Sequence, residues 1–230
     1  MERFLKIAGI SNVLETPDIL CNLYVSEKQE GKLIFNNTGI LFFAKKLSEI
    51  YYHTVVTCVL YRDSEKVYIL DKKDFNDDIV SNIDDAMNFF KKHIPVRYEM
   101  TGSPRRKEIP EIPYDALREA IINAVTHRDY FEKGANVLVE MFDDRIEISN
   151  PGGLMKGLSP EEFGKKSVLR NPSIANLLHR IEYIEKVGTG INKIKRLMAE
   201  AKLNPPKFEF TSFFTVTFEA EIIWMKNISK

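Results

Sequence analysis

The stretch REAIINAVTHRDY, residues 118–130, decides how we expect the chain to fold. Glu119, Asn123 and His127 recur in it every four residues, and helix geometry stacks residues at that spacing on one face. The apolar residues between them point elsewhere and can supply a buried stripe: Ile121, Ile122 and Val125. The spacing therefore predicts a helix, beginning at Pro113, that presents a carboxylate, a carboxamide and an imidazole along one side.

Two glycine-rich turns follow this helix along the chain. The first ends the two-strand pattern DDRIEISNPGGL (143–154), and the second, in KVGTGINKI (186–194), begins a new helix. Free backbone N–H groups at the start of a helix suit an anion such as a phosphate. A carboxylate and a carboxamide on one helix, followed by two such turns, are a suitable set of groups for holding Mg²⁺ and a nucleotide.

The composition is that of an ordinary soluble globular protein. Of the 230 residues, 44% are apolar and 29% are charged, which is enough to form a buried core. Lys plus Arg equals Asp plus Glu at 33 each, whereas a module that binds duplex DNA normally carries a basic excess. We therefore expect this chain alone to bind duplex DNA weakly or not at all.

Cysteine usage and the N-terminus indicate a compartment. Cys21 and Cys58 lie in apolar runs and do not make a disulfide framework, which favours buried, reduced thiols. The N-terminal MERFLKIAGISN lacks the apolar core of a signal peptide, and the apolar run at 39–44 is too short to span a bilayer. The sequence predicts a cytoplasmic protein without a membrane segment.

The rest of the chain alternates helices with pairs of strands. Apolar periodicity predicts further helices from Thr16 to about Val25, over 76–94, in PSIANLLHRIEYI and in GINKIKRLMAEAK. Strand pairs are predicted at 53–71, 96–112, 136–149 and around Thr211. This order favours an α+β fold, a two-layer α/β sandwich with a mixed sheet and helices on one face. We expect a smaller N-terminal α/β subdomain over residues 1–74 and the main domain over residues 75–230.

Four segments in order carry a family resemblance: LREAIINAVTHRDY, FDDRIEISNPGGL, SVLRNPSIANLL, and IEKVGTGI with LNPPKFEF. With them, the chain from about Gly31 to Phe218 resembles transcriptional regulators often labelled "ATP-dependent DNA helicase RecG-related". The C-terminal part of those proteins resembles the GHKL (Bergerat-fold) ATPases of histidine kinases and MutL. The resemblance implies a GHKL-like ATP-binding domain over residues 75–230, with ATP and Mg²⁺ as cofactors.

The resemblance assigns roles to the polar face of the central helix. It makes Glu119 the base that activates the attacking water, makes Asn123 a ligand of Mg²⁺, and turns His127 toward the site. A carboxylate can accept a proton, and a neutral amide oxygen suits a hard cation already neutralised by phosphates. The alternative is a solvated helix face with a polar pair and no ligand.

The first glycine turn departs from the GHKL pattern. Histidine kinases carry D-x-G-x-G there, whereas this chain has Asn150, Pro151, Gly152 and Gly153. Asn150 can still accept the adenine amino group, but a neutral hydrogen bond is weaker than a charged one, so we expect roughly tenfold weaker adenine binding. A tight Pro-Gly-Gly turn without a ligand is the alternative.

The second turn resembles the G-T-G-L-G of histidine kinases. Gly188, Thr189 and Gly190 match it, Asn192 replaces the third glycine, and Lys186 just before it can reach a phosphate. Asn tolerates left-handed backbone better than most residues, so this replacement weakens the phosphate loop without excluding it. The alternative is a plain turn at the start of a helix.

Between the turns, residues 157–185 occupy the place of the ATP lid. No G-x-x-x-x-G-K-[ST] loop occurs in the chain, so the sequence gives no chemical support for a helicase motor. Slow ATP hydrolysis through Glu119 is the activity that the resemblance implies.

Two functional hypotheses stay open. In the first, the chain is the ATP-binding module of a transcriptional regulator. Lid closure would change the geometry of a homodimer, and DNA would be bound only through an upstream AlbA-type (Schlafen-like) domain absent from this chain. In the second, the site is degenerate and the domain is a non-enzymatic scaffold for dimerisation or interaction.

Overall fold

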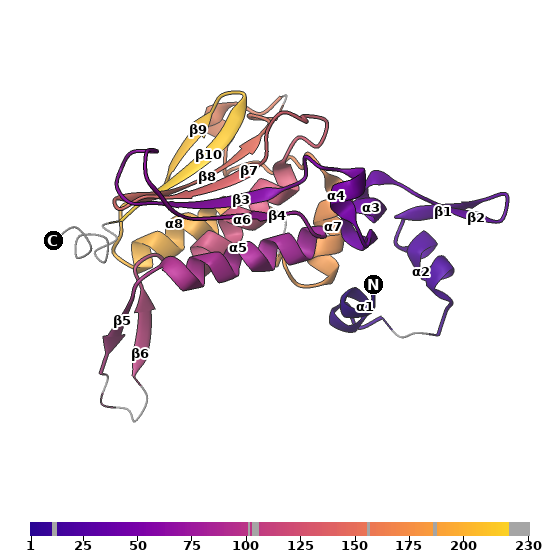
Figure 1. Ribbon diagram of the computed structural model, residues 1–230, viewed down its shortest axis with the longest axis horizontal. Coiled ribbons are helices and arrows are strands. Elements are labelled where there is room, and N and C mark those ends of the chain that lie inside the picture. The colour runs from indigo at the N-terminus through magenta and orange to yellow at the C-terminus, as the bar shows by residue number, and fades with distance from the viewer. Residues whose placement is uncertain (11–12, 101, 103–105, 156, 186–187, 221–230) are drawn as a thin grey trace.

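The computed structural model of the chain describes residues 1–10, 13–100, 102, 106–155, 157–185 and 188–220 (Figure 1). Its helices are α1 (Glu2–Ile7), α2 (Thr16–Asn22), α3 (Asn37–Phe43), α4 (Leu47–Ile50), α5 (Ile79–His93), α6 (Tyr114–His127), the 3₁₀ turn η1 (Pro160–Glu162), α7 (Pro172–Arg180) and α8 (Gly190–Glu200). Its strands are β1 (Ser26–Gln29), β2 (Lys32–Phe35), β3 (Val56–Tyr61), β4 (Ile69–Phe75), β5 (Val96–Glu99), β6 (Lys107–Pro110), β7 (Val137–Met141), β8 (Arg145–Pro151), β9 (Lys207–Phe210) and β10 (Phe213–Glu219).

A six-stranded mixed sheet organises the fold. Its strand order is β4-β3-β7-β8-β10-β9; β3 and β7 run parallel, and the other neighbours run antiparallel. Helices α5, α6 and α8 lie together on one face of this sheet (Figure 1). The two-layer α+β architecture expected from the order of elements is confirmed.

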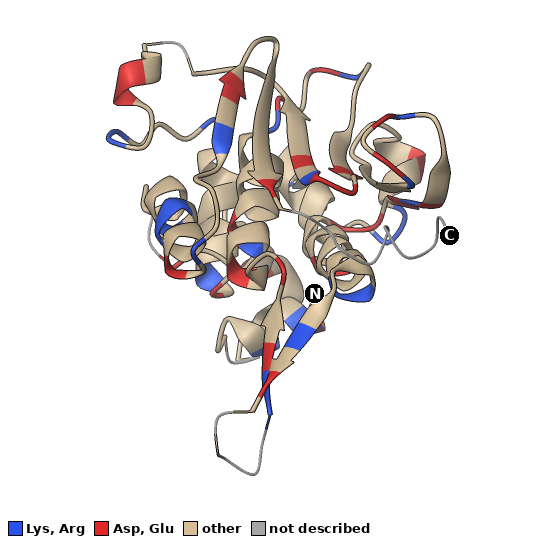
Figure 2. Ribbon diagram, turned by 90° about the vertical axis from the view of Figure 1, so that its left-hand side faces the viewer, with Lys and Arg blue, Asp and Glu red and all other residues tan. Residues whose placement is uncertain are grey.

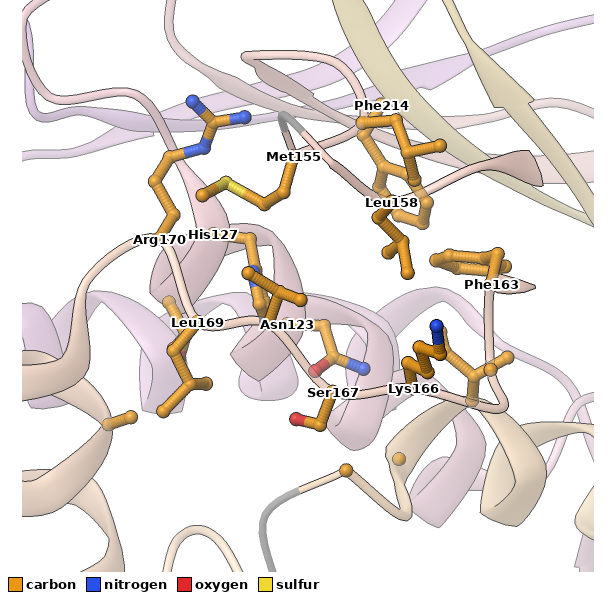
Figure 3. Close-up of a pocket in the computed structure, with 18 of the residues that line it drawn as sticks. Asn123, His127, Met155, Leu158, Phe163, Lys166, Ser167, Leu169, Arg170 and Phe214 are labelled. Carbon is orange, nitrogen blue, oxygen red and sulfur yellow. The ribbon is translucent and has the colours of Figure 1, made fainter. Parts of the chain in front are cut away.

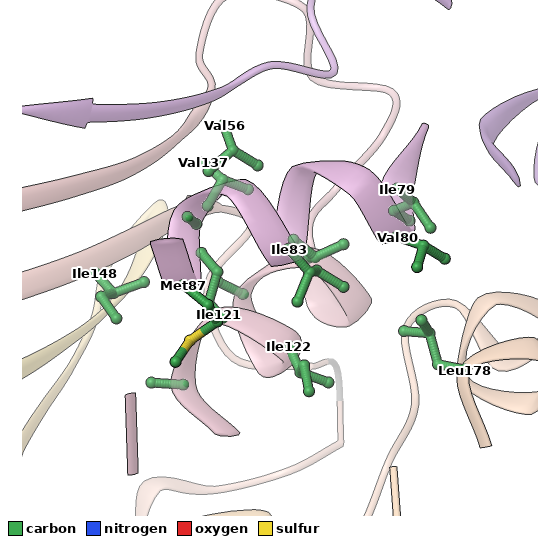
Figure 4. Packing of buried hydrophobic residues seen from close by; sticks show 14 of the residues in the cluster. Val56, Ile79, Val80, Ile83, Met87, Ile121, Ile122, Val137, Ile148 and Leu178 are labelled. Atoms are coloured by element: carbon green, nitrogen blue, oxygen red, sulfur yellow. The ribbon is translucent and has the colours of Figure 1, made fainter. Parts of the chain in front are cut away.

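The core lies between this sheet and the helices. Alternate residues of β8 point into it, namely Ile146 and Ile148, because successive side chains of a strand face opposite sides. Ile83 of α5 and Ile121 of α6 pack with them in one buried apolar cluster (Figure 4). Burial of this stripe fixes the rotation of α6 and leaves its other side for polar residues.

The long helix predicted over 76–94 is confirmed as α5. The Asp78 carboxylate caps it by accepting hydrogen bonds from the backbone N–H groups of Val80 and Ser81, and its last turn carries Lys91, Lys92 and His93. Strand β4 continues through a charged run to Phe75, beyond the predicted end at residue 71, because this edge strand is largely exposed and tolerates charges. Helix α2 ends at Asn22, three residues before the predicted end.

The N-terminal part is linked to the main sheet. Strands β3 and β4 belong to the six-stranded sheet, so the boundary predicted at residue 74 falls within β4. That residues 1–74 form a folding unit of their own stays a prediction. Two short hairpins, β1–β2 and β5–β6, lie outside the sheet and extend from the body of the molecule (Figure 1).

Charged residues of both signs are distributed over the molecule. Figure 2 shows Lys and Arg interspersed with Asp and Glu along the helices and strands of that view. In the described part of the chain, every helix is too short or too polar to cross a membrane.

Candidate functional site

One face of α6 borders a cavity. Glu119, Asn123 and His127 are partly buried, and all three line the same cavity of about 120 Å³. The helix spacing read from the sequence therefore does bring these three side chains together.

The other walls come from segments far along the chain. The cavity is also lined by residues 152–155, by residues between Leu158 and Arg170, by the start of α8 and by Phe214 of β10. Asn123 and His127 lie between Leu169 on one side and Leu158 and Phe163 on the other (Figure 3). Apolar walls with a few polar groups between them are typical of a small-molecule site.

The Glu119 carboxylate lies among charged groups from α8 and the loop before it. Its side chain is 12% exposed, and Lys193 Nζ lies 3.8 Å from Glu119 Oε2 and 2.7 Å from Glu185 Oε1. Burial raises the pKa of Glu119, and the positive charge of Lys193 opposes that rise. A half-buried carboxylate with a raised pKa is suited to accept a proton.

The side-chain nitrogen of Asn123, Nδ2, is buried and lacks a hydrogen-bond acceptor among the described residues. Such a buried orphan costs free energy unless a ligand or water pairs with it. The amide is therefore available to a ligand in the cavity.

The surroundings of Gly190 explain why α8 begins with a glycine. A Cβ added there would overlap Glu119 Oε1 and would lie 3.0 Å from Asn123 Nδ2. The N-terminal end of α8 thus lies directly against the two side chains that the resemblance assigns to Mg²⁺ and to the attacking water. These residues fit a Mg-nucleotide: they provide an amide whose Nδ2 donor is unpartnered among the described residues, a carboxylate and a helix start without a side chain.

His127 is neutral at physiological pH in this environment. Burial, with a smaller contribution from the charge of Arg170, lowers the pKa of His127 to about 4. A neutral imidazole can pack against a planar ring or share a hydrogen bond without bringing a charge into the cavity.

The glycines of the first turn are explained by packing within the protein. A Cβ added at Gly153 would overlap the carbonyl oxygen of Thr211, and one at Gly152, whose φ is +97°, would lie 3.0 Å from Arg170 Cζ. The Gly152 N–H donates to Ser212 O at 2.9 Å. Both glycines line the cavity, yet the contact of Gly153 with Thr211 and the positive φ of Gly152 favour glycine whether or not a ligand binds.

Asn150 is buried below this turn. It is 0% exposed, its Nδ2 donates to Pro151 O at 3.1 Å, and its buried Oδ1 has no donor within the described residues. The structure does not place it among the residues that line the cavity.

The second turn contributes unevenly to the site. Gly188 and Gly190 line the cavity, whereas Thr189 is exposed and does not. Lys186 lies outside the described residues.

Residues 170–172 (Arg-Asn-Pro) lie within the segment predicted to be the lid, and in the structure they make contacts that support the fold. Asn171 Nδ2 donates to two carbonyl oxygens at the end of α6, those of Thr126 and Arg128, at 2.8 Å each. Arg170 donates to Gly153 O at 2.8 Å. These bonds join the segment to α6 and to the first turn. An Asn-Pro pair before a helix is a signal for a helix start, but it does not reveal which distant carbonyls the Asn will meet.

Arg128 of the HRD sequence also serves the fold. It is 1% exposed, and its guanidinium donates to the backbone oxygens of four residues: His53, Asp129, Glu132 and Ala135. It thereby ties the start of β3 to the loop after α6.

No cluster of three or more His, Cys, Asp or Glu side chains that could hold a metal occurs in the described part of the chain. A metal at this site would therefore depend on oxygen atoms of a ligand, such as phosphates, as well as on Asn123.

Comparison with known proteins gives a match between part of the chain and one protein family. Residues 134–218 match the model of the family described as "Putative ATP-dependent DNA helicase recG C-terminal". The match is to an ATPase-like domain; it supports the RecG-related part of the resemblance and suggests nucleotide binding. It covers both glycine turns and the segment between them, and it begins after α6.

A solved structure shares the fold. The DIP2311 protein from Corynebacterium diphtheriae superposes with a TM-score of 0.77 and is 19% identical, over 96% of this chain and 45% of that chain. The present chain thus spans less than half the length of that protein. No curated protein matches the chain.

Proposed function

We propose that the chain binds ATP with Mg²⁺ in the cavity bordered by α6, the start of α8, residues 152–155 and residues 158–170. The observation that carries the proposal is the buried Asn123 Nδ2, which has no acceptor among the described residues and lies beside Glu119 and the glycine start of α8. Such a donor can pair with a phosphate oxygen, and the amide oxygen of the same side chain is the proposed metal ligand. The match of residues 134–218 to an ATPase-like family supports the proposal independently.

Each polar residue has a role in this proposal. Asn123 turns its amide oxygen to the metal, Glu119 accepts a proton from water, and Gly188 and Gly190 leave room for phosphates at the helix start. Bound Mg²⁺ would neutralise phosphate charge. Thr189 and Lys186 are proposed as further phosphate contacts, and His127, Gly152 and Gly153 as the walls around the nucleoside.

Asn150 is proposed to accept the adenine amino group. Its Oδ1 is buried and has no donor among the described residues. Because Asn150 is not part of the present cavity wall, this contact requires the cavity to enlarge.

The proposal extends to regulation. As an ATP-dependent module of a cytoplasmic transcriptional regulator, the chain would couple closure of residues 157–185 to the geometry of a homodimer. DNA would be contacted through an upstream domain. ATP hydrolysis through Glu119 would be slow and would reset the module.

A thermal-shift titration with Mg-ATP tests the binding step. A ligand at 100 times its Kd adds about 2.7 kcal/mol of stability. Asn123→Ala should lose the Mg-dependent shift, whereas Glu119→Gln should keep binding and lose any turnover, since removing a base affects mainly the transition state. Asn88→Ala, an exposed asparagine of α5 outside the cavity wall, is the matched control. Equal Mg-ATP affinity in wild type and Asn123→Ala would refute the assignment.

The second candidate is a non-enzymatic dimerisation or interaction scaffold. It is supported by the first turn, where the contact of Gly153 with Thr211 and the positive φ of Gly152 favour glycine without a ligand. The absence of any shift with millimolar Mg-ATP in the wild type would select it.

A further inference from the structure

Asn192 contacts the lid rather than the cavity. It lies in the first turn of α8, at the position where the related G-T-G-L-G pattern has its third glycine, and its Nδ2 donates to Gly164 O at 3.0 Å. The residue that looks like a defect in a phosphate loop is thus the donor of a hydrogen bond to the lid segment.

The same part of the lid lies close to the second turn at two more points. A Cβ added at Gly188 would be 2.8 Å from Ser167 Cβ, and one at Gly164 would be 3.2 Å from Ile191 Cγ2. Gly164 and Ser167 therefore lie directly against the start of α8 and the turn before it. This is the place where phosphates would meet free N–H groups.

The lid is also held on its far side. The ring of Phe163 packs against those of Phe208, Phe210 and Phe214 of the β9–β10 hairpin, with centroid distances of 5.3, 4.7 and 5.7 Å. These apolar contacts fix one edge of the lid, while the Asn192 bond fixes the edge above α8. The cavity left beneath, about 120 Å³, is smaller than the roughly 300–1,000 Å³ of typical ligand sites.

We propose that Asn192 is a positioning residue that holds residues 163–167 closed over the start of α8, so that a nucleoside triphosphate must break the Asn192–Gly164 hydrogen bond to enter. The identity of the ligand rests on the proposed function, whereas the Asn192–Gly164 hydrogen bond is independent of it. Loss of one neutral, exposed hydrogen bond corresponds to a roughly two- to tenfold change in the open population.

Hydrogen exchange of the backbone amides in residues 163–167, without nucleotide, tests the contact. Asn192→Asp removes the donor but keeps the size, and its negative charge favours the N-terminal turn of α8, so fraying of that helix is not the cause of any effect. We expect exchange to become roughly two- to tenfold faster in the lid and to stay unchanged in α7. An intermediate rate in Asn192→Gln, which keeps a donor, supports the same role. Equal lid exchange in Asn192→Asp and wild type would overturn it.

A second measurement separates the contact from the nucleotide. Asn192→Gly, which restores the glycine of the related pattern, should bind Mg-ATP more tightly by the same factor by which it opens the lid, because a ligand binds in proportion to the competent population. If both proteins bind Mg-ATP, faster lid exchange without tighter binding in Asn192→Gly would overturn the gating role. If neither protein binds Mg-ATP while the exchange pattern holds, the proposed function fails and the contact stands.

Discussion

The two glycine-rich turns look alike in sequence but are glycine-rich for different reasons. Gly153 of the first turn lies against a backbone oxygen of the β9–β10 turn, whereas Gly190 of the second lies against the side-chain ends of Glu119 and Asn123. Backbone cannot move aside, whereas the ends of flexible side chains can. Gly153 is therefore required for packing, whereas Gly190 leaves room at the polar end of the cavity.

The largest effect is expected at Gly153. In Gly153→Ala the new methyl group overlaps Thr211 O, and overpacking against fixed backbone should cost about 3 kcal/mol of unfolding free energy. Urea unfolding measures it, with Gly134→Ala as the control. A Cβ at Gly134 meets only the end of the Glu132 side chain. If Gly153→Ala lowered the unfolding free energy by less than about 1 kcal/mol, the contact with Thr211 would not be what requires a glycine in the first turn.

His127, which lines the cavity bordered by both turns, should make stability depend on pH. Its pKa is about 4 in the folded protein and about 6.5 when unfolded, so the unfolded chain binds more protons between these values. Stability is fully present above pH 6.5 and falls by about 2–3 kcal/mol as the pH drops to 4. The difference between wild type and His127→Gln in urea unfolding across this range isolates the effect. A pH-independent difference would show that His127 is not desolvated.

A smaller effect is expected at Gly152. Its φ of +97° strains any other residue, and a Cβ would press on the guanidinium of Arg170, which can shift. Gly152→Ala should therefore cost about 1–2 kcal/mol, less than Gly153→Ala. Urea unfolding of the two variants side by side gives the ranking, and the reverse order would mean that backbone strain outweighs the clash with Thr211.

The smallest change in stability is expected at Gly190. Gly190→Ala displaces only the ends of Glu119 and Asn123 and gains helix propensity, so unfolding free energy should change by less than about 1 kcal/mol. Mg-ATP affinity should nevertheless fall about tenfold, since the displaced groups are the proposed ligand contacts. Calorimetry with Mg-ATP and urea unfolding together test this. A stability loss as large as that of Gly153→Ala would make the second turn a packing turn as well.

Much of the fold follows from short-range patterns. The four-residue recurrence in α6 and the apolar stripe beside it are properties of one helix, so the sequence predicts that Glu119, Asn123 and His127 share a face, and they do. The alternation of buried and partly exposed residues in β8 and the Asp78 cap of α5 are equally local. They place the elements without knowledge of the rest of the chain.

What the sequence by itself determined is therefore the class of fold, the polar face of α6 and the two turns that approach it. Only the tertiary structure decided what each turn contacts. The Asn192–Gly164 bond spans 28 residues and the Asn171–Thr126 bond spans 45, and neither has a local signal. Such contacts form because the sheet and the helix layer bring distant backbone together. A pattern of neighbouring residues fixes which way a side chain points, but the rest of the folded chain fixes what it meets.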